Sequence, residues 1–340
     1  MHKFWNTQPV PDDHSEYTGE VDTSRDYDPN PVPLPEQFEW SECTVKEAAD
    51  LLSSHYIRDE HFALEYGEKF VEWATTPEWN LGLRTKSGGK LVGFISGMPC
   101  KYRVKKDVFD ALQINFLCVH DTLRNQRLAP LLISEIRRRA NARGIWQAVY
   151  TAVAELPGAV AKTGYWHRLL NVPKLNKAKF SNERERPHMV HGTSEYTVMK
   201  SSDIPRVTKM LRKHMESYDV APVIDESWVR RWLMPKENII YSYVGQNSFT
   251  SYYEVPYTSV KTGVHIRQAY MFFNTSVDFK DASILARNAG FDVYNTMDVG
   301  LKHETLESNK FMRGNGHNHC YVYNWSCGSS SFSDIYMRFF

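Results

Sequence analysis

The chain lacks a long apolar run. In its 340 residues, no apolar stretch approaches the ~18 residues that a membrane-spanning helix requires. The N-terminal segment Met1-His-Lys-Phe-Trp-Asn6 is polar and has no apolar signal core. We therefore expect a cytoplasmic protein without stable membrane insertion.

Cysteines are few and show no pairing pattern. An odd number of thiols at scattered spacing, without a C-x-x-C motif, is typical of a reducing compartment and gives no zinc spacing. His317-Asn-His-Cys320 contains metal-ligand residue types, but a second ligand pair is missing, so we predict a loop and no metal site. The five cysteines are Cys43, Cys100, Cys118, Cys320 and Cys327.

An excess of charge is also missing. Lys and Arg number 41 against 40 Asp and Glu, a formal net charge of +1. A nucleic-acid-binding protein usually shows a broad basic face, so we expect no nucleic-acid partner. Aromatic residues are abundant, with 19 Tyr and 9 Trp, which suits apolar grooves with hydrogen-bonding tips.

Two parts of the chain repeat one order of elements. Each part reads as a hairpin, a strand, a helix stopped by glycine, and a further strand, which indicates an old duplication and an α/β (α+β) fold. Residues 1–40 are predicted to form an extended arm, Thr44 with Glu47 predicts a capped helix over 44–55, and 171–205 is the joint between halves. The predicted ranges are 81–85, 91–96, 113–120, 130–143 and 145–151, then 238–244, 249–255, 265–274, 281–289 and 291–299.

A basic loop joins the strand over 113–120 to the helix that begins near Pro130. The N-terminus of a helix presents unpaired N–H groups and a partial positive charge. Arg124 and Arg127 lie at that position, so the loop suits a phosphate-rich ligand. A solvated surface loop is the alternative interpretation of this motif taken alone.

The wider sequence resembles a known family. Arg124-x-x-Arg127-x-Ala129 is similar to the acyl-CoA pyrophosphate loop of GNAT-type acyltransferases. Seven segments in order resemble the glycylpeptide N-tetradecanoyltransferase (N-myristoyltransferase) family: Phe4-Trp-Asn-Thr-Gln-Pro-Val-Pro11, Asn115-Phe-Leu-Cys-Val-His120, Gln147-Ala-Val-Tyr-Thr-Ala152, Tyr165-Trp-His-Arg168, Pro235-x-Glu-Asn-Ile-Ile240, Gly290-Phe-Asp-Val-Tyr-Asn295 and Tyr323-Asn-Trp325.

The resemblance spans essentially the whole chain, and it implies a fold and a reaction. The fold is two GNAT-like halves related by pseudo-twofold symmetry around a saddle-shaped mixed sheet. Residues 1–172 would bind myristoyl-CoA, and residues 173–340 would form most of the peptide groove. The reaction would move myristate from CoA to the amine of an N-terminal glycine on peptides and nascent proteins. We expect a monomer without a ribosome-targeting N-terminal extension.

The resemblance also implies catalytic roles. Backbone N–H groups of Phe116 and Leu117 would form the oxyanion hole for direct attack on the thioester. The terminal carboxylate of Phe340 would be the base, and Asn115 and Thr151 would orient the amine. The ordinary interpretations are a frayed terminus and residues that simply belong to a strand. A Cys118–His120 nucleophile is disfavoured, because that spacing on one strand face arises easily by chance.

The implied ligand contacts fall into two groups. The myristoyl-CoA contacts are Lys3, Phe4, Trp5, Phe116, Leu117, Cys118, Val119, Arg124, Asn125, Arg127, Leu128 and Ala129, with a hydrophobic plug as the alternative for Phe4 and Trp5. The peptide contacts are Tyr56, Asp59, Phe62, Tyr66, Tyr165 and His167, with Asp59 and Glu60 forming an acidic loop.

Three positions depart from the family pattern. Gln126 removes a positive charge near the cofactor, Val153 is expected to crowd a strand end where the family commonly has glycine, and Asn315 removes a carboxylate. These changes leave open an acyltransferase of altered acyl or acceptor specificity, or a module that binds acyl-CoA or N-terminal glycine without turnover.

Overall fold

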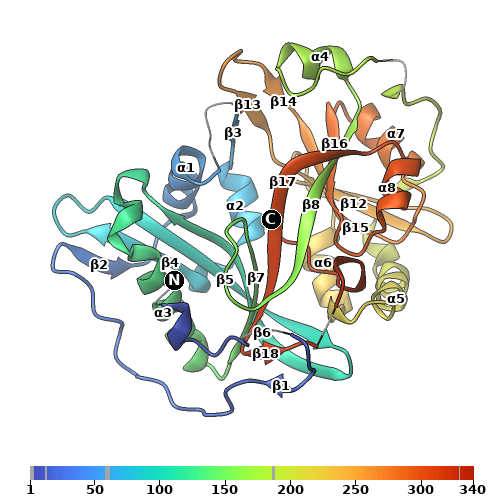
Figure 1. Ribbon diagram of the computed structural model, residues 1–340. Helices are drawn as coiled ribbons and strands as arrows, with labels where there is room; N and C mark the ends of the chain where they lie inside the picture. The colour runs from blue at the N-terminus through green and yellow to red at the C-terminus, as the bar shows by residue number, and fades with distance from the viewer. Residues whose placement is uncertain (1–3, 12–13, 58–61, 186–187, 329) are drawn as a thin grey trace.

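The computed structural model describes residues 4–11, 14–57, 62–185, 188–328 and 330–340. A mixed sheet of 13 strands crosses the molecule in the order β2-β4-β5-β6-β7-β17-β8-β16-β15-β12-β11-β9, with β10 paired to β5 (Figure 1). The strands are β2 (Phe38–Ser41), β4 (Asn80–Thr85), β5 (Leu91–Val104), β6 (Asp107–Val119), β7 (Gln147–Ala152), β8 (Ala159–Leu169), β9 (Thr197–Val198), β10 (Val220–Pro222), β11 (Ile240–Val244), β12 (Phe249–Glu254), β15 (Gln268–Asn274), β16 (Val293–Met297) and β17 (Met312–Tyr323).

The sheet has the same construction when read from either edge. In the first half an antiparallel run β4-β5-β6 leads through α3 (Leu128–Asn141) to β7, which is parallel to β6. In the second half β11-β12-β15 leads through α7 (Lys280–Asn288) to β16, which is parallel to β15. This repeat confirms the predicted fold class.

The halves exchange a strand at the centre of the sheet. β8 follows β7 in the chain but pairs with β16, whereas β17 comes from the end of the chain and pairs with β7. β8 and β17 pair with each other. The pseudo-twofold axis therefore lies between these two strands, while a boundary between residues 172 and 173 stays a prediction.

Helices cover the sheet and form a core that both halves share. Buried side chains of α1 (Val45–His55), α2 (Glu68–Ala74), α5 (Ile204–Met215) and α6 (Glu226–Leu233) belong to one hydrophobic cluster. The predicted cap of α1 is confirmed, since Thr44 and Glu47 form a reciprocal capping box. The remaining short helices are α4 (Val172–Lys177) and α8 (His303–Ser308).

Several predicted elements differ in extent. The strands predicted over 91–96 and 113–120 are longer, as Leu91–Val104 and Asp107–Val119. Helix α3 begins at Leu128, before Pro130, because the first turn of a helix has no use for the N–H that proline lacks. The predicted strand 265–274 is divided: β14 (His265–Ile266) joins a small sheet with β13 (Tyr257–Ser259) and β3 (Phe62–Leu64), and β15 stays in the main sheet.

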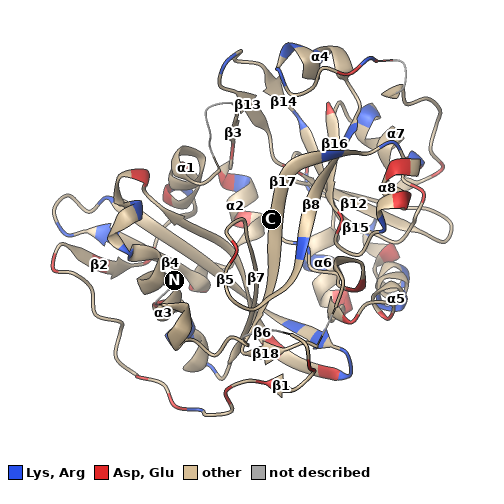
Figure 2. Ribbon diagram, in the orientation of Figure 1, with Lys and Arg blue, Asp and Glu red and all other residues tan. Residues whose placement is uncertain are grey.

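The N-terminal arm wraps the body. Its strand β1 (Gly19–Glu20) pairs with β18 (Trp325–Ser326) near the chain's other end. Gln8 accepts hydrogen bonds from Arg137 and from Tyr323, so the arm is fixed to α3 and β17. Figure 2 shows basic and acidic residues interspersed over the ribbon. Within the described ranges, no helix combines the length and apolar character needed to cross a membrane.

Candidate active site

A cavity of about 70 Å³ lies where the two halves meet. Its wall combines strands β7 and β8 with strands of the second half and with the end of the chain. Predicted site residues Tyr66, Thr151, Tyr165 and Phe340 are brought together there. The other lining residues are Ile57, Leu64, Tyr253, Val255, Tyr270, Met271, Thr296, Met297, Asn318, Arg338 and Phe339.

The end of the chain is docked in this wall. Figure 1 places the C-terminus at the centre of the molecule, beside β17 and β8. The Phe340 ring lies 4.6 Å from that of Trp73 and 5.2 Å from that of Phe272, measured between centroids. The Tyr253 hydroxyl donates a hydrogen bond of 3.0 Å to the Phe339 carbonyl. These contacts hold the last residue in place.

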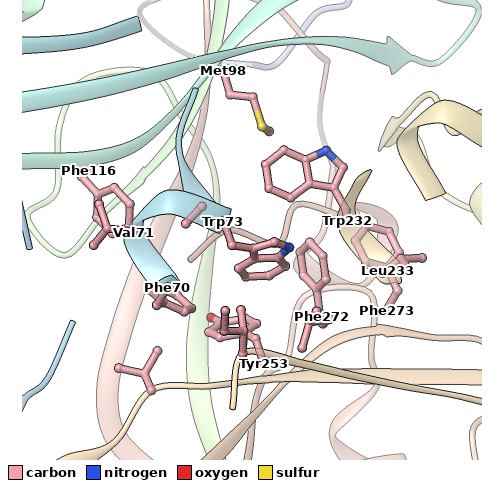
Figure 3. Packing of buried hydrophobic residues seen from close by; sticks show 14 of the residues in the cluster. Phe70, Val71, Trp73, Met98, Phe116, Trp232, Leu233, Tyr253, Phe272 and Phe273 are labelled. Atoms are coloured by element: carbon pink, nitrogen blue, oxygen red, sulfur yellow. The ribbon is translucent and has the colours of Figure 1, made fainter. Parts of the chain in front are cut away.

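The aromatic side chains that receive Phe340 form a continuous cluster. Figure 3 shows Trp73, Trp232, Tyr253 and Phe272 gathered in the core. The Trp73 and Trp232 rings meet edge to face at 5.7 Å. The cluster is built from α2, α6 and strands of the second half, and it forms the apolar surface on which the Phe340 ring packs.

Most titratable groups in the cavity wall cannot accept a proton near neutrality. Burial raises the pKa of Tyr165 to about 12, and burial likewise raises the pKa values of Tyr66, Tyr253 and Tyr270. These phenols stay protonated at neutral pH. Among the described residues that line the cavity, the terminal carboxylate of Phe340 is thus the remaining group that can accept a proton.

Arg338 places a buried cation in the same wall. Its side chain is 5% exposed, and its guanidinium donates to Thr296 Oγ1 at 3.1 Å and to the Val299 carbonyl at 2.7 Å. These partners are neutral, so the positive charge is left to act on the cavity.

Strand β6 passes beside the cavity with an irregular edge. Its pairing with β5 shifts by one residue, so that Ser96 faces Phe116, Gly97 faces Ile114, and Asn115 is bulged. Its parallel pairing with β7 ends at Gln113. Backbone groups beyond Gln113 therefore have no strand partner on the β7 side.

The side chains of this segment point elsewhere. Phe116 is fully buried, with its ring 5.8 Å from that of Tyr56. The Asn115 side-chain amide donates a hydrogen bond of 2.8 Å to the Ala74 carbonyl and accepts one of 2.7 Å from the Gln113 side chain. Asn115 does not line the cavity. Burial raises the pKa of the Cys118 thiol to about 12, which argues against a thiolate nucleophile.

The predicted phosphate loop folds as expected from its position. A 3₁₀ helix, η3 (Asp121–Gln126), leads to Arg127, which adopts a left-handed conformation with φ of 57° and caps α3. Arg124, Asn125 and Arg127 are exposed. Leu128 is buried against the sheet, and this contact fixes the first turn of α3 beside the exposed loop.

The N-terminal aromatic pair covers the same side of the sheet. The Trp5 ring stacks on Tyr150 of β7 at 6.2 Å and meets Phe4 edge to face at 5.2 Å. Trp5 is buried, so it packs as a plug in this structure, and its predicted contact with a cofactor stays a prediction. Lys3 and Asp59 lie outside the described residues.

Predicted peptide contacts form two neighbouring groups. Tyr56 and Tyr66 lie together, with ring centroids 5.7 Å apart, and of the two only Tyr66 lines the cavity. Phe62 and His167 instead both contact Phe180. His167 Nδ1 lies 2.8 Å from Asn295 Oδ1, and burial lowers the pKa of His167.

The three departures from the family pattern are all on the surface. The expectation that Val153 crowds a strand end is wrong, because its side chain is 66% exposed beyond the end of β7. Gln126 and Asn315 are exposed as well. None of these side chains lines the cavity.

Sequence reasoning missed several cavity residues. Tyr253, Tyr270, Asn318 and Arg338 line the wall, and Asn318 donates to the Tyr165 hydroxyl at 3.0 Å. Only Arg338 carried a signal, since it lies two residues before the terminus that was predicted to act. The others come from strands whose cavity-facing side chains depend on the strand exchange.

Comparison with known proteins identifies relatives along the whole chain. Residues 19–163 match the family model for the N-terminal domain of myristoyl-CoA:protein N-myristoyltransferase, and residues 174–334 match that for its C-terminal domain. The chain is similar to glycylpeptide N-tetradecanoyltransferase 1 of Arabidopsis thaliana, with 34% identity over 97% of this chain and 87% of the relative. It is 36% identical to glycylpeptide N-tetradecanoyltransferase 2 of Danio rerio, over 96% and 75% of the two chains.

Solved structures agree with this similarity. The chain superposes on Saccharomyces cerevisiae N-myristoyltransferase with bound myristoyl-CoA with a TM-score of 0.91, 27% identity and 99% coverage of both chains. A GCN5-related N-acetyltransferase from Anabaena variabilis shares the fold at a TM-score of 0.50 and 9% identity, over 84% and 72% of the two chains.

Proposed function

Because the chain belongs to the N-myristoyltransferase family, we propose that it transfers myristate from myristoyl-CoA to an N-terminal glycine by direct attack of the amine on the thioester. The observation that supports this most is the docked terminus. Among the described residues that line the cavity, Phe340 carries the only group able to accept a proton at neutral pH, since the phenols and the Arg338 guanidinium are already protonated. The proposed reaction needs a base at that place.

The first step is removal of a proton from the incoming amine. An α-amino group has a pKa near ~7.7–8.0, so most of it is protonated and unreactive at neutral pH. The Phe340 carboxylate accepts that proton, while the neutral Tyr253 hydroxyl holds the tail through the Phe339 carbonyl. A positioned base typically contributes about 10²–10⁴ in rate.

In the second step the amine nitrogen bonds to the thioester carbon and negative charge develops on the thioester oxygen. Collapse of this intermediate breaks the C–S bond and releases CoA, with one amine proton passing to the leaving sulfur. Backbone N–H groups of Phe116 and Leu117 lie on the part of β6 that follows the bulge and lacks a β7 partner. We assign them to the oxyanion, with Asn115 and Thr151 at the amine. One such donor is worth about 10²–10³ in rate.

Myristoyl-CoA is the acyl donor in this proposal. Arg124, Asn125 and Arg127, with the first N–H groups of α3 at Leu128 and Ala129, hold its phosphates. Cys118 and Val119 on β6, and Lys3, Phe4 and Trp5 of the arm, complete the contact. The Tyr56–Tyr66 pair, Tyr165, Phe62, His167 and Asp59 contact the peptide. We expect a monomer acting on nascent proteins in the cytoplasm.

The proposal is tested with two peptides that differ at one residue. A peptide beginning with glycine and its alanine-starting counterpart are incubated with myristoyl-CoA, and free CoA is measured by chromatography. Chromatography is preferable to a thiol dye because the chain has five free cysteines of its own. We expect CoA release with the glycine peptide only.

Two results would contradict the proposal. Equal release with both peptides would exclude glycine specificity. Binding of both ligands without release, measured by calorimetry, would indicate a binding module. Acyl-CoAs of ten to sixteen carbons, compared in the same assay, distinguish a myristoyl enzyme from one with altered acyl preference.

A further inference from the structure

Two histidines and an aspartate converge beside the phosphate loop. His55 is the last residue of α1, His120 follows β6, and Asp121 opens η3. Their ligand atoms all lie within 4.8 Å of one another. The imidazole rings are 4.0 Å apart between centroids. The cluster has no part in the acyl transfer proposed above.

We propose that His55, His120 and Asp121 form a binding site for a divalent cation of the zinc class. The two Nδ1 atoms approach different oxygens of one carboxylate, each at 3.2 Å. Tetrahedral zinc with bonds of about 2.0–2.1 Å separates its ligand atoms by about 3.3 Å. The spacing thus fits an ion placed between them.

Hydrogen bonding accounts for only part of this arrangement, since His120 has Thr122 Oγ1 at 3.0 Å from its Nδ1 and Lys90 Nζ at 3.2 Å from its Nε2. Nδ1 of His55 is buried from solvent, yet it has no partner with hydrogen-bond geometry in the described part of the chain. A buried nitrogen of this kind normally has a partner. A cation bound to its lone pair supplies one.

The exposure of the three side chains also suits a bound ion. The histidine side chains are 16% and 15% exposed, whereas Asp121 is 57% exposed, so the site opens to solvent on one side. Three protein ligands leave the fourth position to water, as in open zinc sites.

Two cations oppose binding, and they set its strength. Lys90 Nζ lies 3.2 Å from His120 Nε2, which favours the tautomer that keeps a proton on Nδ1. Arg124 donates to the His55 carbonyl. Lys90 is exposed and can turn away, but both charges repel an ion. We therefore expect weaker affinity than at four-ligand structural sites.

Cobalt substitution tests the site directly. The full chain, without an affinity tag and stripped by a chelator, is titrated with Co²⁺ and then with Zn²⁺ as competitor. We expect visible d–d bands of four-coordinate Co²⁺ that saturate at one ion per chain and are displaced by Zn²⁺. Thiolate charge-transfer bands in the near ultraviolet would instead place the ion on a cysteine and overturn the proposal.

Variants separate this site from nonspecific binding. His55→Gln and His120→Gln should each weaken binding at least tenfold. His317→Gln, at another pair of neighbouring imidazoles, should leave it unchanged. Lys90→Met should strengthen binding, because it removes the competing ammonium. Circular dichroism of the metal-free variants verifies that they fold.

Thermal unfolding gives an independent measurement. An ion that joins α1 to η3 stabilises the folded chain by mass action, so Zn²⁺ should raise the melting temperature of the wild type and not that of His120→Gln. A wild type that shows no d–d bands, or a band that persists in both histidine variants, would refute the site.

Discussion

The terminal carboxylate can be removed without removing the side chain that docks it. Cys327 lies fourteen residues from the end, counting both, so a synthetic peptide for 327–340 can be ligated to the preceding chain at a native cysteine. The peptide is made with a C-terminal acid, as the matched control, or with a C-terminal amide. A third protein carries Phe340→Ala and keeps the acid.

The two changes have separate energetic consequences. The amide keeps the ring contacts with Trp73, Phe272 and Tyr253, so docking persists, and loss of the base lowers kcat by about 10²–10⁴. Phe340→Ala loses five aromatic pairs, each worth about 0.5–1.5 kcal/mol; the partners are Phe70, Trp73, Trp232, Tyr253 and Phe272. Because the Phe340 ring is partly exposed, we take a total loss of about 2–3 kcal/mol of docking free energy. This loss weakens tail docking by about 30–150-fold.

Turnover is measured as CoA release, with cofactor affinity and melting temperature as controls for folding. The amide should retain both controls, and its residual rate should rise about tenfold per pH unit until the amine is deprotonated near pH ~8. Phe340→Ala should lose turnover without this steeper pH dependence. An amide protein with the kcat of the ligated acid would refute the assigned base.

Three further changes test other parts of the structure. Tyr253→Phe removes one buried hydrogen bond to the tail, worth about 1 kcal/mol, and should lower kcat up to about fivefold with unchanged cofactor affinity; an unchanged kcat would contradict its role. Arg127→Gly removes the strain of the left-handed conformation, so the melting temperature should stay the same or rise. It also removes a positive charge, so KM for myristoyl-CoA should rise about tenfold. Arg127→Ala keeps the strain and should have a lower melting temperature than Arg127→Gly. Burial raises the pKa of Glu135, but hydrogen bonds from Arg138 and Arg139 and from the backbone of the arm outweigh it, and the pKa lies below its ordinary value. Glu135→Gln should therefore cost about 3 kcal/mol of unfolding free energy at pH 7. In urea titrations this deficit should begin to shrink as pH falls below the ordinary Glu pKa of about 4.3 and should be lost as pH falls through the lower pKa of the folded state; a deficit independent of pH would contradict this.

Local signals in the sequence predicted much of each half. The Thr44 cap, the glycine stop after each crossover helix, and the short apolar runs of β4, β5, β11 and β12 are set by neighbouring residues. These features made the internal repeat visible. They also placed Arg127 at the mouth of α3, which the structure shows.

Long-range pairing was beyond the reach of such signals. β8 and β17 exchange between halves, and their registers are fixed by partners far away in the chain. The cavity positions of Tyr270 and Asn318, and the meeting of His55 with His120, follow from that pairing and from helix packing. The crowding expected at Val153 was wrong for the same reason, since the direction of that side chain depends on where β7 ends.

The central position of β17 has a consequence for the order of events during synthesis. The sheet of the first half is incomplete until residues 312–323 have left the ribosome, because β7 pairs with β17, which lies near the end of the chain. The proposed base appears later still, since a free carboxyl group on Phe340 exists only after the ester to transfer RNA is hydrolysed. The proposed mechanism therefore predicts that a nascent copy is inactive and that its first turnover follows its own release.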